Sequence, residues 1–264
     1  MPATGTIDPT KDGHSDLFYS AYARLKARWI KKIKPGGRLL EVGCGEGHFL
    51  TAAKSVGYEV AGIEAHPERA ERSAKRIRGE VRCGLLETLD RRNGRFDVVY
   101  HCDLLSHFAD PVKSLRTMQQ YLSPDGILAF EAGTLGGINP FWYRLIGGLG
   151  FPQHRWLYSE VSLRKMLETA GLRIIKMRHF GLAPAVALHY SHFAAGQLFR
   201  KINPRVFQTT HRASRAAVLS RTSSAQEWSD SVDQFFRYRI GSLVPRIGPA
   251  TWLIAAAPSR ERPS

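Results

Sequence analysis

The sequence has few cysteines and no apolar run suited to crossing a membrane. Its three cysteines, Cys44, Cys83 and Cys102, form no CxxC pair, which argues against a disulfide framework or a zinc site. We therefore expect reduced thiols, a cytoplasmic protein and no bound metal. The first ten residues lack the charged-then-apolar pattern of a signal peptide. Residues 181–199 carry no Asp, Glu, Lys or Arg, but their proline, histidines and glutamine make them too polar to predict a membrane-spanning helix.

Acidic residues are also scarce. The 264 residues include 38 Lys and Arg against 23 Asp and Glu, which gives a formal net charge of +15. Such an excess favours anionic partners, namely phosphate esters, nucleic acid or an anionic membrane surface, and does not distinguish among them. The length and an apolar content of 43% suit one domain with a substantial core.

Short β-type runs alternate with helical patterns. The expected strands cover residues 38–42, 58–64, 80–84, 95–102, 127–132, 172–180 and 250–257. The expected helices cover residues 14–33, 46–56, 67–77, 110–122 and 159–170, with a turn SPDG at 123–126 and mainly helical patterns over 181–248. Strands separated by helices predict parallel βαβ units and a sheet covered on both faces.

The stretch LLEVGCGEGHFL places Glu41 at the end of an apolar strand and follows it with Gly43, Gly45 and Gly47. Such a strand–turn–helix presents free backbone N–H groups at the carboxyl edge of a sheet, where ligands of α/β proteins bind. His48 holds the position of the third glycine of G-x-G-x-x-G, and no Gly-Lys-Ser/Thr of a P-loop follows. A carboxylate here repels a diphosphate and attracts positive charge. S-adenosylmethionine fits, because it has a sulfonium, an ammonium and no phosphate.

The second expected strand ends in another acid, Glu64. A carboxylate at this position can accept both hydrogen bonds of a ribose diol, as in dinucleotide sites. An Arg or Lys there would instead indicate a 2′-phosphate. The position therefore supports a nucleoside ligand without that phosphate.

These features occur in an order that resembles the class I S-adenosylmethionine-dependent methyltransferases. The resemblance rests on LLEVGCGEGHFL, VAGIEAHPERA, RFDVVYHCDLLSHFADP and LSPDGILAFEA, and covers residues 36–180 and 250–257. It implies a three-layer, Rossmann-like α/β fold with a seven-stranded, mostly parallel sheet, helices on both faces and an antiparallel last strand. We divide the chain into an N-terminal tail and helix (1–35), the methyltransferase core (36–180), a helical insert at the acceptor side or a membrane surface (181–248), and the last strand and tail (249–264).

The resemblance also implies a cofactor site for S-adenosylmethionine. Glu41, Gly43 and Gly45 are expected to meet the methionine part and Glu64 the ribose, while the residues after the fourth strand lie near cofactor and acceptor. The full expected set is Glu41, Gly43, Cys44, Gly45, Gly47, Glu64, Ala65, Leu86, Asp103 and Leu104.

One departure from the family concerns adenine. Gly84-Leu85 stands where the family often has Gly-Asp after the third strand. We therefore expect adenine to be held by backbone groups near Leu86 or by Glu87, and the sequence does not decide between them.

Two histidines are candidate catalytic residues. His154, in FPQHRWLYS, can take a proton from an acceptor hydroxyl, or it can cap and pack the following helix. His107, in SHFADP, matches a histidine frequent in the family, where it organises the loop or takes part in catalysis. His101, at the end of the fourth strand, can line the pocket or pack in the core.

Positive charge gathers in residues 138–222, which contain thirteen Lys or Arg against two Asp or Glu. Three alternatives remain open: peripheral contact with an anionic membrane, a cover over the pocket of an anionic or lipid-like acceptor, or a solvated basic face. We expect an enzyme that methylates a small-molecule or lipid-like acceptor, by O-methylation.

Two other functions compete with this one. A nucleic-acid methyltransferase is not favoured, because CDLLSH stands where an Asn/Asp-Pro-Pro-Tyr/Phe motif would hold a flipped base, and no Pro-Cys nucleophile occurs. A non-enzymatic module at a membrane surface need not keep Glu41, the glycine turn and Glu64. The oligomeric state is left open.

Overall fold

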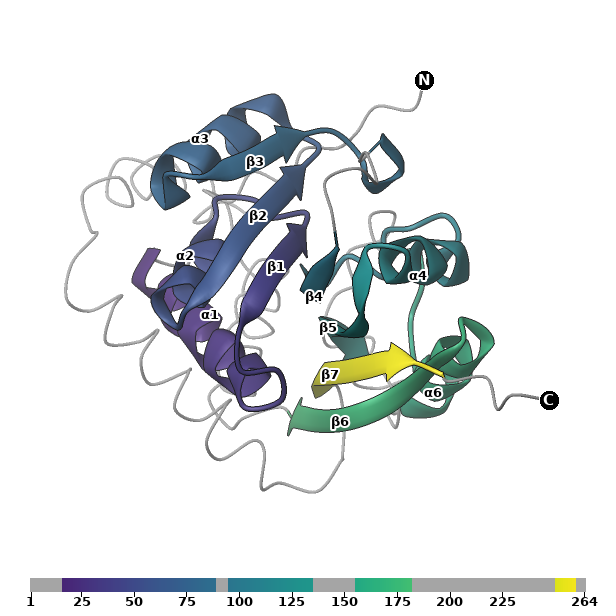
Figure 1. Ribbon diagram of the computed structural model, residues 1–264. Coiled ribbons are helices and arrows are strands. Elements are labelled where there is room, and N and C mark those ends of the chain that lie inside the picture. Colours follow the sequence, from purple (N-terminus) through teal and green to yellow (C-terminus); the bar gives the residue numbers. More distant parts are fainter. Residues whose placement is uncertain (1–15, 89–94, 135–154, 182–249, 260–264) are drawn as a thin grey trace, which may run out of the picture. The chain divides into compact units, whose positions relative to one another are not determined.

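The computed structural model describes residues 16–88, 95–134, 155–181 and 250–259 (Figure 1). The chain divides into two units, and the unit that holds most of the sheet comprises Ser20–Gly136, Gly150–His179 and Pro249–Ser264. The other unit comprises Met1–Tyr19, Gly137–Leu149 and Phe180–Gly248. The predicted helical insert, apart from Gly181, and the candidate base His154 lie outside the described residues.

Seven strands form one sheet in the order β3-β2-β1-β4-β5-β7-β6. The strands are β1 (Gly37–Val42), β2 (Tyr58–Glu64), β3 (Glu80–Cys83), β4 (Phe96–Cys102), β5 (Leu122–Thr134), β6 (Leu172–Gly181) and β7 (Ala250–Pro258). The helices are α1 (Asp16–Lys31), α2 (His48–Ser55), α3 (Pro67–Ile77), α4 (Pro111–Gln119) and α6 (Glu160–Thr169), with a short 3-10 turn η2 (Leu86–Thr88). The predicted strands and helices that fall on described residues are all present.

The sheet topology places the reversal of strand order between β1 and β4. Strands β1 to β5 pair in parallel, and β7 pairs with β5 in the antiparallel sense. The chain winds outward through β2 and β3 and then returns to place β4 on the other side of β1. Right-handed crossovers then put the connecting helices on opposite faces. Figure 1 shows α1, α2 and α3 on one side of the sheet and α4 and α6 on the other, as predicted.

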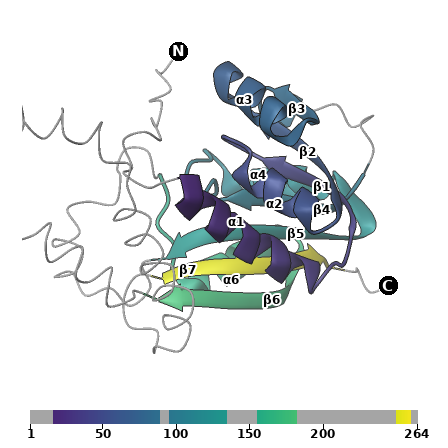
Figure 2. The same ribbon diagram turned by 90° about the vertical axis from the view of Figure 1, so that its left-hand side faces the viewer.

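Figure 2 shows β5, β7 and β6 side by side at one edge of the sheet, with β7 running opposite to both neighbours. The predicted seven-stranded, mostly parallel sheet with an antiparallel last strand is therefore confirmed.

Local sequence explains where the elements begin and what they bury. Val98, Val99 and Tyr100 of β4 are fully buried, because a central parallel strand is covered on both faces. Helix α4 begins where the Asp110 side chain accepts a hydrogen bond from the Lys113 backbone N–H at 2.9 Å, and α6 begins with a capping box.

The predicted turn SPDG at 123–126 is wrong, because these residues belong to β5. Phe96 pairs with Leu122 and Val98 pairs with Ile127, so residues 123–126 bulge opposite Asp97. Asp97 anchors this bulge by accepting a hydrogen bond from Ser123 Oγ at 3.2 Å. A Ser-Pro-Asp-Gly run has the same composition in a bulge as in a turn, so the sequence alone could not separate the two.

The core on β5 generates a stability prediction. Leu128 is fully buried in the sheet, so Leu128→Ala should lower the free energy of unfolding by about 2–5 kcal/mol, through lost burial and the cavity left behind. Leu157→Ala is the matched control, since Leu157 is 52% exposed and its loss should change stability by less than about 0.5 kcal/mol. Urea unfolding measures both, and equal effects would contradict this packing.

Candidate functional site

The carboxyl ends of β1, β2 and β4 meet where the strand order reverses, and they carry acids. Glu41 lies near the end of β1, Glu64 ends β2, and Asp103 follows β4. Ligands of open α/β sheets bind at such a switch point. The structure thus brings together the acids that the sequence selected.

The turn between β1 and α2 has three glycines in the left-handed region, with φ of 71° at Gly43, 52° at Gly45 and 77° at Gly47. A Cβ on Gly43 would lie 2.6 Å from Leu104 Cδ1, and a Cβ on Gly47 would lie 2.5 Å from Ser73 Oγ. A Cβ on Gly45 would meet no atom within 4 Å. Gly43 and Gly47 are therefore required for packing, whereas Gly45 presents a bare backbone to open space.

Backbone and carboxylate hydrogen bonds fix this turn against β2. The N–H groups of Gly43 and Cys44 donate to the Ile63 carbonyl at 2.8 and 3.2 Å. The Gly45 N–H donates to Glu64 Oε2 at 2.8 Å, and the His66 N–H donates to Glu64 Oε1 at 3.0 Å. One carboxylate therefore joins the loops that follow β1 and β2.

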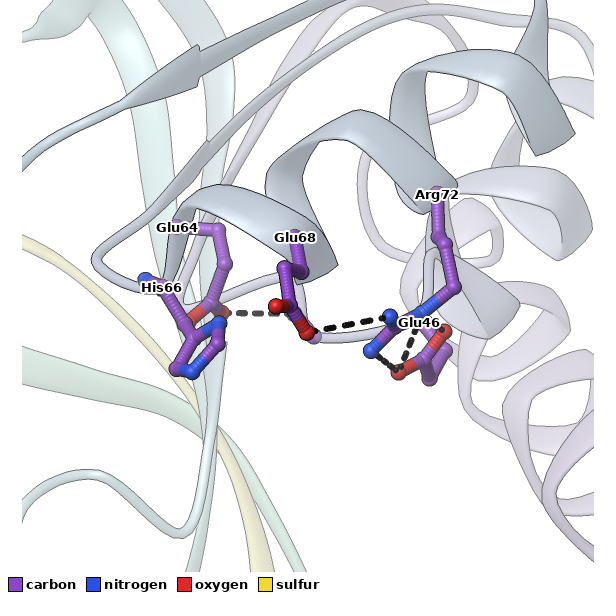
Figure 3. A network of polar contacts seen from close by, with 6 residues as sticks. Glu46, Glu64, His66, Glu68 and Arg72 are labelled. Carbon is purple, nitrogen blue, oxygen red and sulfur yellow. Dashed lines mark hydrogen bonds and ion pairs between the residues drawn. The ribbon is translucent and has the colours of Figure 1, made fainter. Parts of the chain in front are cut away.

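A second clamp, which the sequence did not predict, reaches the turn from α3 (Figure 3). Arg72 donates from Nε and Nη2 to Glu46 at 2.8–3.2 Å, and its Nη1 lies 3.8 Å from Glu68. The hydrogen bond from Arg72 lowers the pKa of the Glu46 carboxyl. This ion pair holds the turn from α3, while Glu64 holds it from the end of β2.

Glu41, unlike Glu64, is a buried acid of the site with an oxygen that no hydrogen bond satisfies among the described residues. The residue is only 4% exposed, and among the described residues Glu41 Oε2 has no hydrogen-bond partner. Burial raises the pKa of Glu41 well above its ordinary value, the charge of Lys26 lowers it, Glu64 raises it, and a backbone hydrogen bond from Leu50 lowers it. A buried carboxylate with an unused oxygen is suited to a cationic or hydrogen-bond-donating ligand.

Lys26, on α1, is the buried cation beside these acids, and sequence reasoning missed it. Its Nζ lies 3.2 Å from Glu131 Oε2 of β5, donates to Cys102 Sγ at 3.2 Å and stands 3.8 Å from the centre of the Tyr22 ring. Tyr22 OH also donates to Glu131 Oε2. One signal in the sequence could have indicated such a cation. Glu131 lies inside the apolar run ILAFEA, and a buried acid requires a partner.

Asp103 and His107 lie on the loop that follows β4. Asp103 has a left-handed backbone with φ of 52°, a strained conformation for a non-glycine residue of the kind that recurs at functional sites. Although the residue reaches solvent, desolvation and then the charge of Glu131 raise the pKa of its carboxyl to about 6, while the charge of His107 lowers it. Leu104 brings this loop against Gly43.

The remaining predicted residues lie as follows. The Cys44 side chain is buried 3.5 Å from Ser73 Oγ, so only its backbone serves the turn. Ala65 is exposed after β2, and Leu86 is buried in η2. The Gly84 N–H donates to the Glu64 carbonyl at 2.9 Å, which brings the end of β3 beside the end of β2.

His101 packs in the core, stacked on Phe130 with ring centres 5.0 Å apart. Burial lowers its pKa to about 3, so the ring is neutral at physiological pH.

Two features are absent from the part of the chain that the structure describes. No group of three or more His, Cys, Asp or Glu side chains within these ranges could hold a metal ion. Among the described helices, none is long and apolar enough to cross a membrane.

The different surroundings of Gly43 and Gly45 generate a second prediction. Gly45→Ala introduces left-handed strain of about 1–2 kcal/mol without overlap, whereas Gly43→Ala adds a clash with Leu104 of about 1–3 kcal/mol. Thermal unfolding of both variants should therefore show the larger loss for Gly43→Ala. A larger loss for Gly45→Ala would contradict the open space above that residue.

Comparison with known proteins identifies the family. The family model for the methyltransferase domain matches residues 14–177. A ubiquinone biosynthesis O-methyltransferase from Cereibacter sphaeroides is 34% identical over 100 residues, which cover 35% of this chain and 40% of that protein. The Azorhizobium caulinodans protein of the same name is 29% identical over 165 residues, 57% of this chain and 64% of that protein. The chain thus covers less than two thirds of the length of these relatives.

Solved structures share the fold at low sequence identity. The cyclopropane synthase MmaA2 from Mycobacterium tuberculosis has a TM-score of 0.55 and 16% identity, over 93% of this chain and 96% of that one. Magnesium protoporphyrin IX methyltransferase from Synechocystis PCC 6803, solved with bound SAH, has a TM-score of 0.50 and 18% identity, over 67% of this chain and 83% of that one. These likenesses confirm the expected fold. Together with the family model, which matches more than half of the residues, they lead to one conclusion: this chain belongs to the methyltransferase domain family.

Proposed function

We propose that this protein is an S-adenosylmethionine-dependent methyltransferase that methylates a hydroxyl group of a small-molecule acceptor. The observation that carries the proposal is Glu41, a buried carboxylate with an unused oxygen at the end of β1, next to a turn with a bare backbone at Gly45. The names of the curated relatives support O-methylation and do not suggest a nucleic-acid acceptor.

The residues present fit this cofactor. Glu41 can accept a hydrogen bond from its ammonium group, and the open face of Gly45 leaves room for its methionine part. Glu64 already accepts two backbone hydrogen bonds, yet a carboxylate has about four acceptor positions, so a ribose diol can still bind there. The backbone from Gly84 to Leu86, beside Glu64, is the proposed adenine side.

When bound, the cofactor supplies an activated methyl group, and its neutral thioether is the leaving group. The protein contributes mainly by alignment, because the glycine turn is fixed by Ile63, Glu64 and Arg72 before the ligand arrives. The loop with Asp103 and His107 is the proposed acceptor side, and His107 is the described candidate for taking the hydroxyl proton.

The nature of the acceptor beyond a small molecule is part of the proposal. The excess of Lys and Arg in residues 138–222 supports an acceptor with an anionic or lipid-like part, or peripheral contact with an anionic membrane. A cytoplasmic location, on the inner face of the membrane where such contact occurs, remains a prediction.

Cofactor binding is tested with Glu41→Gln. Replacing the carboxylate by an amide removes a charge-assisted hydrogen bond worth about 1.5–3 kcal/mol, so the affinity for S-adenosylhomocysteine should fall by roughly 10- to 100-fold. Glu59→Gln is the matched control, because the Glu59 side chain is 73% exposed on β2 and lies outside the crevice. Calorimetry gives both affinities. A wild-type protein that binds neither S-adenosylmethionine nor S-adenosylhomocysteine would refute the function.

The acceptor class is tested by methyl transfer from tritium-labelled S-adenosylmethionine into a cell extract, followed by separation of lipid, small-molecule and polymer fractions. We expect label in the small-molecule or lipid fraction, with the wild type and not with Glu41→Gln. Label confined to nucleic acid would overturn the proposed acceptor.

A further inference from the structure

The buried charges at the carboxyl edge of the sheet do not balance. Glu41, Glu64 and Glu131 are three buried acids, and among the described residues Lys26 is the buried base beside them. Glu64 is satisfied by two backbone N–H groups, and Glu131 by Tyr22 and Lys26. Glu41 is the member of the cluster with an unused, buried oxygen.

The charge of Lys26 is already engaged elsewhere. Burial disfavours this charge, but the nearby carboxylate of Glu131 helps to keep the pKa of Lys26 well above its ordinary value, so the ammonium persists. Burial also raises the pKa of the Cys102 thiol to about 12, so this neighbour is neutral at physiological pH. Glu131, 3.2 Å away, is therefore the ionic partner of Lys26. Because Glu131 neutralises most of the charge of Lys26, only a weaker attraction from this ammonium reaches Glu41.

A buried carboxylate that lacks a full counter-charge takes up a proton rather than stay ionised. A ligand that brings an ammonium group to Glu41 supplies the missing charge and favours the ionised form. Binding of such a ligand is then linked to loss of a proton from Glu41.

We propose, on the basis of the function proposed above, that Lys26 is a positioning residue that sets the charge of Glu41, and that Glu41 releases its proton to solvent when the cationic cofactor binds. The proton leaves a neutral carboxyl, the carboxylate remains in the crevice, and the ammonium of the ligand keeps all its protons. No bond other than this O–H bond changes.

Among the described residues, the titratable groups that act on Glu41 or feel its charge come from α1, the glycine turn, β2 and β4, and they are Lys26, Cys44, Glu64 and Tyr100. Around Lys26 in turn lie Tyr22, Cys102 and Glu131, and its charge also acts on Asp103. Burial raises the pKa values of Cys44 and Tyr100, so both are neutral at physiological pH. Lys26 is therefore the group of this set that can lower the pKa of Glu41 by its charge.

The sign of the pH dependence follows. Because the pKa of Glu41 is raised in the free protein, binding below that pKa requires loss of a proton and tightens as pH rises, by up to about tenfold per pH unit. Above that pKa the carboxylate is already ionised, and the affinity no longer depends on this group.

The experiment is calorimetric titration of the full chain with S-adenosylhomocysteine, in phosphate and in Tris buffer, from about pH 6 to about pH 9. These buffers differ in ionisation enthalpy. The difference between the two observed binding enthalpies, divided by the difference between the two ionisation enthalpies, gives the number of protons released. We expect this number to approach about one at the acid end and to fall towards zero as pH rises. Glu41→Gln, which carries no titratable group, should release none.

Two variants should shift this curve in opposite directions. Lys26→Met removes the cation that lowers the pKa of Glu41, so proton release should persist to higher pH. Glu131→Gln removes the anion that engages Lys26, so release should cease at lower pH. Lys32→Met is the matched control, since Lys32 is exposed immediately after the same helix and should leave the curve unchanged.

If Lys26→Met does not fold, because it leaves Glu131 buried without a partner, the double variant Lys26→Met/Glu131→Gln removes both charges. It should behave as Lys26→Met does, with release extended to higher pH.

Binding with equal enthalpies in both buffers at every pH would overturn the inference and leave the proposed function intact. Shifts in the same direction for Lys26→Met and Glu131→Gln would overturn the role of Lys26. Absence of binding by the wild type at every pH would refute the proposed function, and this inference with it.

Discussion

The constraint on which the site depends is the burial of a carboxylate, Glu41, at the end of a central parallel strand. Such a group is costly in the free protein, since its hydration is lost and one oxygen finds no partner among the described residues. A fold stabilised only by packing would favour an apolar residue at this position. The position is explained if the missing partner is a ligand, and a positively charged ligand supplies both the hydrogen bond and the charge.

The surrounding structure holds that carboxylate beside a rigid, open turn. The Ile63 carbonyl and the Glu64 carboxylate hold the turn from β2, and Arg72 holds it from α3, so little reorganisation is left for the binding step. Leu104 packs against Gly43 and ties the loop after β4 to the same turn. Cofactor and acceptor sides are thereby connected through direct contacts, which suits a reaction that requires alignment of two molecules.

The sequence predicted what depends on local pattern. Apolar runs, glycine spacing and the acids at strand ends identified the sheet, the turn, Glu41 and Glu64, because these signals lie within a few residues of each other. Contacts between distant segments were not predictable in this way. Lys26 and Glu131 belong to elements far apart in the sequence, α1 and β5, and a lysine on an amphipathic helix is ordinarily exposed. The clamp of Arg72 on Glu46 likewise joins residues whose proximity only the βαβ topology establishes. The bulge at 123–126 was mistaken for a turn because both use the same residues. His154 and most of the basic segment lie outside the described residues, so the predictions about them stand as made.

The most direct test of the central claim is a crystal structure of the protein with S-adenosylhomocysteine. The ligand ammonium should lie within hydrogen-bonding distance of Glu41, with the ribose hydroxyls on Glu64 and the methionine part above Gly45. A ligand bound elsewhere, or one whose amino group avoids Glu41 while this carboxylate stays buried without a partner, would contradict the claim.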